Sequence, residues 1–281
     1  MAYETLQSEL DSGILTVTLN RPERLNAMNE QMFQDLMALI DEIDANDDVR
    51  AVIFTGAGRG FCAGADLASG ADTFSVQGPE EKHRDEGGVV TLRLYDCLKP
   101  IIAAFNGPAV GVGATMMLPA DIRLASEKAK FGFVFARRGI VPEACSSWFL
   151  PRVVGINRAM EWVATGRVFG PEEARAGGLV SRVLAPDELL PAARELAREI
   201  AENTSGVSVA LSRQLLWKML GADHPMEAHR LDSRGIHAMG RSPDGYEGVK
   251  SFLEKRPAKF SMQVSSDMPE FFPWWKERSF S

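Results

Sequence analysis

The chain is poor in cysteine and histidine, the residues that most often build disulfide frameworks and zinc sites. Its 281 residues include three cysteines and four histidines. Cys62, Cys97 and Cys145 are odd in number and have no C-x-x-C spacing, which argues against both kinds of site. The histidines are scattered along the chain. We therefore expect no bound metal and no disulfide.

The sequence also lacks a long apolar run and an excess of positive charge. No run reaches the roughly 18 to 20 residues that span a bilayer, and the start MAYETLQSEL has neither region of a secretion signal. A net charge of −7 and a pI near 5.3 give no general attraction for nucleic acid or anionic membranes. We expect a cytoplasmic protein that binds neither.

Glycines gather in the stretch GAGRGFCAGADL, residues 56–67, directly after an apolar β-branched run at 51–55. Glycine lets the backbone approach a ligand closely, and the first N–H groups of a helix opening at 63–67 would have no partner within it. Such a loop can hold an anion or a developing oxyanion on its amides. A turn that needs glycine only for geometry is the alternative. The spacing matches neither the dinucleotide fingerprint nor a P-loop.

A second strand, glycine loop and small-residue helix start follows at 101–114. Two such elements supply two separate backbone amides that could converge on one atom, which is the arrangement of an oxyanion hole. Close helix packing through Gly111, Gly113 and Ala114 is the alternative interpretation of this stretch.

Periodicity and turn residues predict an alternating α/β chain with a helical end. Strands are expected at 13–19, 51–55, 101–105, 121–126, 131–133 and 179–183. Helices are expected at 30–46 with Asn29 as N-cap, 89–98, a stretch after 147, 156–164, 171–176, 187–202, 207–220, 224–238 and 243–254. Residues 68–88 lose periodicity and suggest a lid or pocket wall. The end, 261–281, carries Phe271, Phe272, Trp274 and Trp275. It either docks these rings on some surface or is disordered, and we expect docking because large rings are costly to leave in water.

Four motifs, in order, make the sequence resemble the crotonase family, also called the enoyl-CoA hydratase/isomerase superfamily, over about residues 5–260. The motifs are Leu19-Asn20-Arg21-Pro22 with Leu25-Asn26-Ala27, Phe61-Cys62-Ala63-Gly64-Ala65-Asp66-Leu67, Asn106-Gly107-Pro108-Ala109-Val110-Gly111 with Ala120-Asp121, and Gly177-Gly178-Leu179-Val180.

The resemblance implies an α/β fold, a spiral of ββα units with a helical C-terminal trimerisation region. We accordingly divide the chain into a core at 1–200 with the ligand site, a helical region at 201–260 and an aromatic-rich extension at 261–281. The resemblance also implies a homo-oligomer, either a trimer or a dimer of trimers that forms a hexamer.

The resemblance implies a coenzyme A thioester as substrate, with no permanently bound cofactor. The family's two oxyanion-binding amides fall on Ala65 and Val112, a position that is often glycine. Phe252 matches an aromatic that touches coenzyme A from an adjoining subunit. The other positions that would bind coenzyme A, several through main-chain groups, are Arg24, Leu25, Ala27, Ala63, Asp66 and Leu67.

The sequence departs from the hydratases at both of their glutamates, where it has Thr115 and Phe135. Pro142-Glu143-Ala144-Cys145-Ser146-Ser147 resembles instead the P-E-G-C-S-S string that carries the single base of peroxisomal-type Δ3-Δ2 enoyl-CoA isomerases. We therefore predict an enoyl-CoA isomerase of fatty acid metabolism with Glu143 as proton shuttle. The alternatives are a purely dipole-stabilising Glu143, a hydratase, a coenzyme A thioester-binding paralogue without turnover, or an assembly protein that uses its aromatic tail on a partner.

Overall fold

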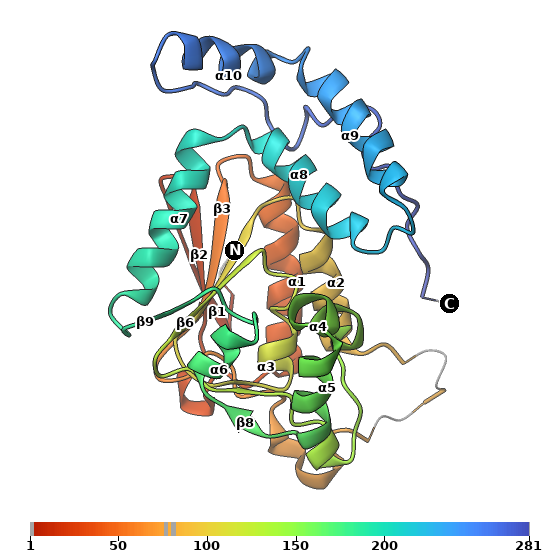
Figure 1. The fold of residues 1–281 in the computed structure, drawn as a ribbon. Coiled ribbons are helices and arrows are strands. Elements are labelled where there is room, and N and C mark those ends of the chain that lie inside the picture. The colour runs from red at the N-terminus through yellow and green to blue at the C-terminus, as the bar shows by residue number, and fades with distance from the viewer. Residues whose placement is uncertain (1–2, 76–77, 80–82, 281) are drawn as a thin grey trace.

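Two β-sheets and the helices around them form the protein in a computed structural model that describes residues 3–75, 78–79 and 83–280 (Figure 1). The strands are β1 (Leu6–Asp11), β2 (Ile14–Leu19), β3 (Ala51–Gly56), β4 (Ile101–Phe105), β5 (Ala109–Val110), β6 (Ile122–Ser126), β7 (Phe131–Gly132), β8 (Val168–Phe169) and β9 (Arg182–Leu184). The α-helices are α1 (Glu30–Ala45), α2 (Glu86–Asp96), α3 (Val112–Thr115), α4 (Ser146–Val154), α5 (Ile156–Thr165), α6 (Pro171–Ala176), α7 (Leu189–Asn203), α8 (Gly206–Met219), α9 (Pro225–Met239) and α10 (Pro243–Leu253). Short 3₁₀ turns are η1 (Pro22–Arg24), η2 (Leu67–Asp72) and η4 (Ala136–Arg138).

The main sheet has six strands in the order β1-β2-β3-β4-β6-β9, and only the β1–β2 pair is antiparallel. Its central strands are buried on both faces, so alternate side chains enter two different cores. Ile53 and Ile102 pack against α7, whereas Phe54 and Phe105 enter the larger core with α1 and α2. Figure 1 shows α7 on one side of the sheet and α1 and α2 on the other.

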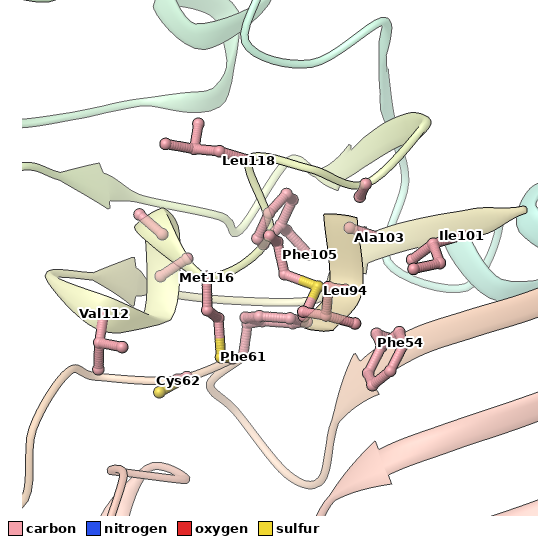
Figure 2. Close-up of a cluster of buried hydrophobic side chains, with 14 of the residues drawn as sticks. Phe54, Phe61, Cys62, Leu94, Ile101, Ala103, Phe105, Val112, Met116 and Leu118 are labelled. Atoms are coloured by element: carbon pink, nitrogen blue, oxygen red, sulfur yellow. The ribbon is translucent and has the colours of Figure 1, made fainter. Parts of the chain in front are cut away.

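The smaller sheet, β5-β7-β8, stands beside the ends of β3 and β4. Aromatic rings join it to the main core, since Phe105 contacts Phe61 at 4.6 Å and Phe131 at 5.1 Å between ring centroids. Figure 2 shows Phe61, Phe105, Met116 and Val112 in this cluster; Phe61 and Val112 belong to the two glycine-rich loops themselves. The two loops therefore pack against a close-packed apolar core.

Most expected elements are present, and the differences have local causes. The strand β1 was not expected because only Leu6 of its six residues is buried, as suits an edge strand. Helix α2 begins three residues earlier than expected, at Glu86, because the Asp85 carboxylate caps it. The strand expected at 179–183 is β9 at Arg182–Leu184. No helix opens at 63–67; a 3₁₀ turn begins at Leu67 with Asp66 as its cap.

The helical end and the tail lie along one side of the core. Helices α8, α9 and α10 follow one another above the sheet in Figure 1. Among the tail's aromatic residues, Phe271, Phe272 and Trp274 pack against the apolar cluster that contains Val207 and Leu211 of α8. Over the ranges that the structure describes, none of the helices is both long and apolar enough to cross a bilayer.

A buried arginine fastens α8 to the core. The Arg213 side chain is 3% exposed and forms an ion pair with Asp121 at 2.8 Å. Its remaining N–H groups donate to the carbonyl oxygens of Leu94, Tyr95, Cys97 and Pro119. A planar guanidinium with five donors suits this set, and an ammonium group does not.

We predict that Arg213→Lys lowers the free energy of unfolding by about 2–4 kcal/mol, because several buried carbonyl oxygens lose their donors. Urea unfolding followed by circular dichroism measures this change. Arg198→Lys is the matched control, since the exposed Arg198 is 3.9 Å from Glu202 and should change stability by less than about 0.5 kcal/mol. Equal effects of the two substitutions would contradict the assignment.

Candidate active site

The two glycine-rich loops touch through their backbones, and only glycine allows this approach. A Cβ atom at Gly107 would lie 2.1 Å from the carbonyl oxygen of Arg59, and one at Gly113 would lie 2.1 Å from that of Cys62. The Val110 N–H donates to the Cys62 carbonyl at 3.0 Å across the same contact. The small residues therefore serve close packing, and this packing places the two loops side by side.

Two asparagine side chains hold the first loop, and both donate to the Gly60 carbonyl oxygen. Asn26 Nδ2 donates to the carbonyl oxygens of Ala57 and Gly60. Asn106 donates to Gly58 and accepts from the Gly56 N–H at 3.0 Å. Backbone groups of the loop, among them the buried Gly60 carbonyl, are satisfied in this way. Both asparagines belong to the motifs on which the family resemblance rests.

Ala65 and Val112 hold equivalent places in the two loops, because each follows a glycine with positive φ. Gly64 has φ of 107° and Gly111 has φ of 55°, conformations that favour glycine. Within the part of the chain that the structure describes, neither the Ala65 N–H nor the Val112 N–H donates to another protein group. The Ala65 amide thus owes its direction to Gly64 and not to a helix start, which corrects the sequence-based explanation. Two free amides on adjacent loops can bind one oxyanion.

A cavity of about 840 Å³ opens beside these amides. Of the predicted site residues it is lined by Ala63, Ala65, Leu67, Val112 and Glu143. Much of the remaining wall is apolar, including Phe33, Phe74, Val134, Phe135 and Ile140. A second hollow of about 730 Å³, between α9 and the tail, contains none of the predicted site residues. The first cavity is therefore the candidate active site.

Glu143 presents its carboxylate to this cavity from the loop before α4. Its Oε1 accepts a hydrogen bond of 2.5 Å from the Thr115 hydroxyl. Oε2 has no hydrogen-bond partner among the residues that the structure describes. Burial raises the pKa of Glu143 to about 7; the Thr115 hydrogen bond opposes this shift, and the negative charge of Asp85 adds to it. Such a carboxyl can both take up and release a proton near neutral pH.

Thr115 and Phe135 occupy the positions where the hydratases carry glutamates. Thr115 is fully buried and hydrogen-bonded to Glu143, and Phe135 is 4% exposed in the cavity wall. The Glu143 side chain makes no hydrogen bond to the described amides of α4; Ser146 bonds only its carbonyl oxygen. The contacts of the carboxylate therefore do not support a capping role for Glu143.

The remaining residues that were expected to bind coenzyme A lie outside the cavity lining. Leu25 and Ala27 lie beside the first loop, where the Leu25 carbonyl accepts from Ala63 N–H and the Ala27 carbonyl accepts from Arg21. Arg24 is exposed at the end of η1. Asp66 forms an ion pair with Arg21 at 2.9 Å, which lowers the pKa of Asp66.

Phe252 is 81% exposed on α10 and does not line the cavity of its own chain. The predicted pocket wall at 68–88 contributes seven residues to the lining: Thr73, Phe74, His83, Arg84, Asp85, Glu86 and Gly87. Residues 76–77 and 80–82 of that segment lie outside the described residues.

The sequence did not assign the contact of Thr115 with Glu143, nor the specific roles of Asp85 and Gly87 within the predicted pocket wall. A Cβ atom at Gly87 would lie 2.3 Å from Glu143 Oε2, so this glycine makes room for the carboxylate. The sequence contained one indication that Thr115 belongs to the site, because Thr115 occupies the position of one of the two hydratase glutamates. Elsewhere, the described ranges contain no cluster of three or more potential metal ligands.

Comparison with known proteins identifies the family. The protein family described as "Enoyl-CoA hydratase/isomerase" matches this chain over residues 9–263. The enoyl-CoA hydratase ACTT3 of Alternaria alternata is 44% identical over 249 residues, which cover 88% of this chain and 83% of that protein. The 1,2-epoxyphenylacetyl-CoA isomerase of Escherichia coli is 35% identical over 272 residues, covering 92% and 98%.

A solved structure matches the fold over nearly its whole length. The crystal structure of a probable enoyl-CoA hydratase/isomerase from Mycobacterium abscessus superposes with a TM-score of 0.86 at 32% identity, covering 92% of this chain and 99% of that one. The fold and the site define an α/β enzyme that acts on acyl-CoA thioesters. The chain belongs to the enoyl-CoA hydratase/isomerase, or crotonase, family. The predicted fold class is thereby confirmed.

We predict that Glu143→Gln stabilises the protein at pH 8 but not at pH 4.5. The pKa of Glu143 is raised from 4.5 to about 7 on folding, so the native state binds the proton more tightly than the unfolded state. This preference costs the wild type stability as the pH rises from about 4.5 to 7, up to roughly 3 kcal/mol. Urea unfolding of both proteins at several pH values measures the difference. A difference that does not change with pH would rule out the buried, proton-binding carboxyl.

Proposed function

We propose that the protein is an enoyl-CoA isomerase that converts a 3-enoyl-CoA into the conjugated 2-enoyl-CoA. One observation carries this proposal: the cavity holds two unpaired amides together with one buried carboxylate that has a free oxygen among the described residues. A double-bond shift needs one proton carrier and a site for an oxyanion. Glu143 would be the proton carrier, and the two amides would bind the oxyanion.

The thioester carbonyl oxygen would accept hydrogen bonds from the N–H groups of Ala65 and Val112. Removal of a proton from C2 moves negative charge onto this oxygen, and preorganised donors stabilise that charge most in the transition state. Loss of one such donor typically costs about 100- to 1000-fold in rate.

Glu143 would carry the proton. The C2–H bond breaks as Oε2 takes the proton, and its electron pair enters the enolate. When the enolate collapses, the double bond between C3 and C4 moves to C2 and C3, and C4 takes the proton back from Glu143. The pKa of about 7 suits both steps, and the Thr115 bond to Oε1 leaves Oε2 free.

A hydratase is the second candidate, and the names of the relatives favour it. Water addition in this family's manner needs a second carboxylate, and Thr115 and Phe135 do not supply one. Two other carboxylates line the cavity. Asp85 accepts hydrogen bonds from three backbone N–H groups. The Glu86 side chain is largely exposed, and partial desolvation of its carboxylate together with the charge of Glu30 raises its pKa. Glu86 is therefore the residue that a hydratase mechanism would have to use.

The remaining parts of the ligand site belong to the same proposal. Arg24, exposed beside the first loop, would face the phosphates of coenzyme A, and Asp66 would act through the backbone that it holds in place. The exposed Phe252 would contact coenzyme A in an adjoining subunit of a trimer or a dimer of trimers. The exposed apolar side chains of α9 and α10, among them Ile236, Val249 and Leu253, support such an assembly.

We predict that the purified protein converts 3-enoyl-CoA into 2-enoyl-CoA and does not hydrate 2-enoyl-CoA, as followed by absorbance and by mass spectrometry of the products. Glu143→Gln should lower turnover by at least about 1000-fold and leave coenzyme A thioester binding within a few fold. Glu86→Gln is the matched control and should keep turnover within about threefold.

The result that would overturn the proposal is rapid hydration of 2-enoyl-CoA that is lost in Glu86→Gln as well as in Glu143→Gln. Tight thioester binding without turnover of either substrate, and without exchange of the C2 proton, would instead indicate a paralogue that only binds acyl-CoA.

A further inference from the structure

The Asp85 carboxylate connects two segments that meet at Glu143. Its Oδ1 accepts from Gly87 N–H at 3.1 Å, and its Oδ2 accepts from Gly88 N–H at 2.9 Å. These bonds cap α2. Oδ2 also accepts from the N–H of Ala144 at 2.7 Å, although that residue is 59 positions away in the chain. One carboxylate thus joins the start of α2 to the residue that follows Glu143.

The loop after Glu143 has a backbone that its sequence does not favour. Ala144 has φ of 53° and Cys145 has φ of 52°, in the left-handed region that side chains with a Cβ rarely adopt. Two such residues in succession persist only where the surroundings fix them. The Asp85–Ala144 hydrogen bond is a fixing contact at this point, because it holds the peptide N–H that directly follows Glu143.

The start of α2 also bounds the space that the Glu143 carboxylate occupies. The nearest atoms to a Cβ built on Gly87 are Glu143 Oε2 at 2.3 Å, Val112 Cγ2 at 3.2 Å and Ala144 Cβ at 3.3 Å. The capped end of α2 therefore lies against the carboxylate and against one residue of the proposed oxyanion hole. A shift of this end would move the wall against which Oε2 rests.

We propose that Asp85 is the positioning residue for Glu143: by holding the Ala144 N–H and the first turn of α2 together, it sets the direction of the carboxylate relative to the Ala65 and Val112 amides. The inference rests on the proposed role of Glu143. Asp85 itself carries no proton to or from the substrate. Its hydrogen-bonded loop keeps the base at the distance and angle that proton transfer requires.

The charge of Asp85 gives the proposal a second readout. Burial is the largest cause of the raised pKa of Glu143, and the Asp85 charge contributes in the same direction. Asp85→Asn should therefore shift the Glu143 titration to lower pH. The other groups around Glu143 stay unchanged in this variant; they are Thr115 on α3, Cys62 on the first loop, Cys145 on its own loop, His83 and Arg84 before α2, Glu86 on α2 and Arg138 on η4.

The test compares Asp85→Ala with Asp85→Asn in the full-length enzyme. An asparagine oxygen placed where Oδ2 lies can still accept from Ala144 and Gly88, whereas alanine accepts nothing. We expect Asp85→Ala to lower kcat by about 10- to 100-fold with KM changed less than about threefold. Asp85→Asn should keep kcat within about threefold, while the midpoint of its kcat/KM profile moves down by a few tenths of a pH unit.

His224→Ala controls for the loss of a helix cap, because His224 caps α9 away from the site through Met226 N–H. It should leave kcat and the pH midpoint unchanged. Equal kcat for Asp85→Ala and wild type, or an equal loss of kcat in both Asp85 variants, would overturn the proposal. The proposal would also be overturned if the concentration of active Asp85→Ala enzyme, measured by thioester titration, fell enough to account for the whole loss of kcat.

A measurement without turnover separates this proposal from the proposed function. Carbon-13 NMR of glutamate-labelled protein, with the Glu143 signal assigned by Glu143→Gln, reports the titration whether the enzyme isomerises, hydrates or only binds. The positioning role is supported if the Glu143 titration has a lower midpoint in Asp85→Asn and if the Glu143 signal reports faster conformational exchange in Asp85→Ala. Unchanged Glu143 signals in both variants overturn it, even if the wild type isomerises 3-enoyl-CoA.

Discussion

The site depends on the backbone contact between the loops at 56–66 and 106–113. Gly107 and Gly113 allow carbonyl oxygens of the first loop to approach the second closer than any side chain would permit. Asn26 and Asn106 then satisfy the carbonyl groups of the first loop, so that it does not need secondary structure. The result is a pair of amides without protein partners among the described residues, set beside an apolar core. Under the proposed function, such a pair would need little reorganisation when charge develops on the thioester oxygen.

The second requirement is a carboxyl whose environment opposes ionisation without preventing it. Glu143 is buried in a mainly apolar wall but keeps one hydrogen bond, from Thr115, and one free oxygen among the described residues. The threonine replaces the acid that a hydratase would carry there. In the proposed mechanism, threonine at this position removes a water-activating group and at the same time supplies a hydrogen bond that would orient Glu143 as the base. Because the pKa of Glu143 is raised, this arrangement lowers the free energy of unfolding as the pH rises from about 4.5 to 7, and the loss persists at higher pH.

Much of this could be predicted from the sequence, because the governing patterns are local. The central strands are continuous apolar runs, and both glycine loops directly follow a strand, so the positions of the loops could be inferred. The choice of the Ala65 and Val112 amides came from the family resemblance. Glu143 was found through its motif. The cap at Asp85 and its bond to Ala144 join residues 59 positions apart, and no periodicity or spacing encodes such a contact. The edge strand β1 was missed because its exposed polar face resembles a loop.

The central claim is that one carboxylate carries the proton from C2 to C4. It is tested most directly by NMR of the product formed from 3-enoyl-CoA that carries deuterium at C2. If one carboxyl that is shielded from solvent carries the proton, part of the deuterium will reappear at C4 of the 2-enoyl-CoA product. Product in which C4 contains only hydrogen from solvent, or a 3-hydroxyacyl product, would contradict the account.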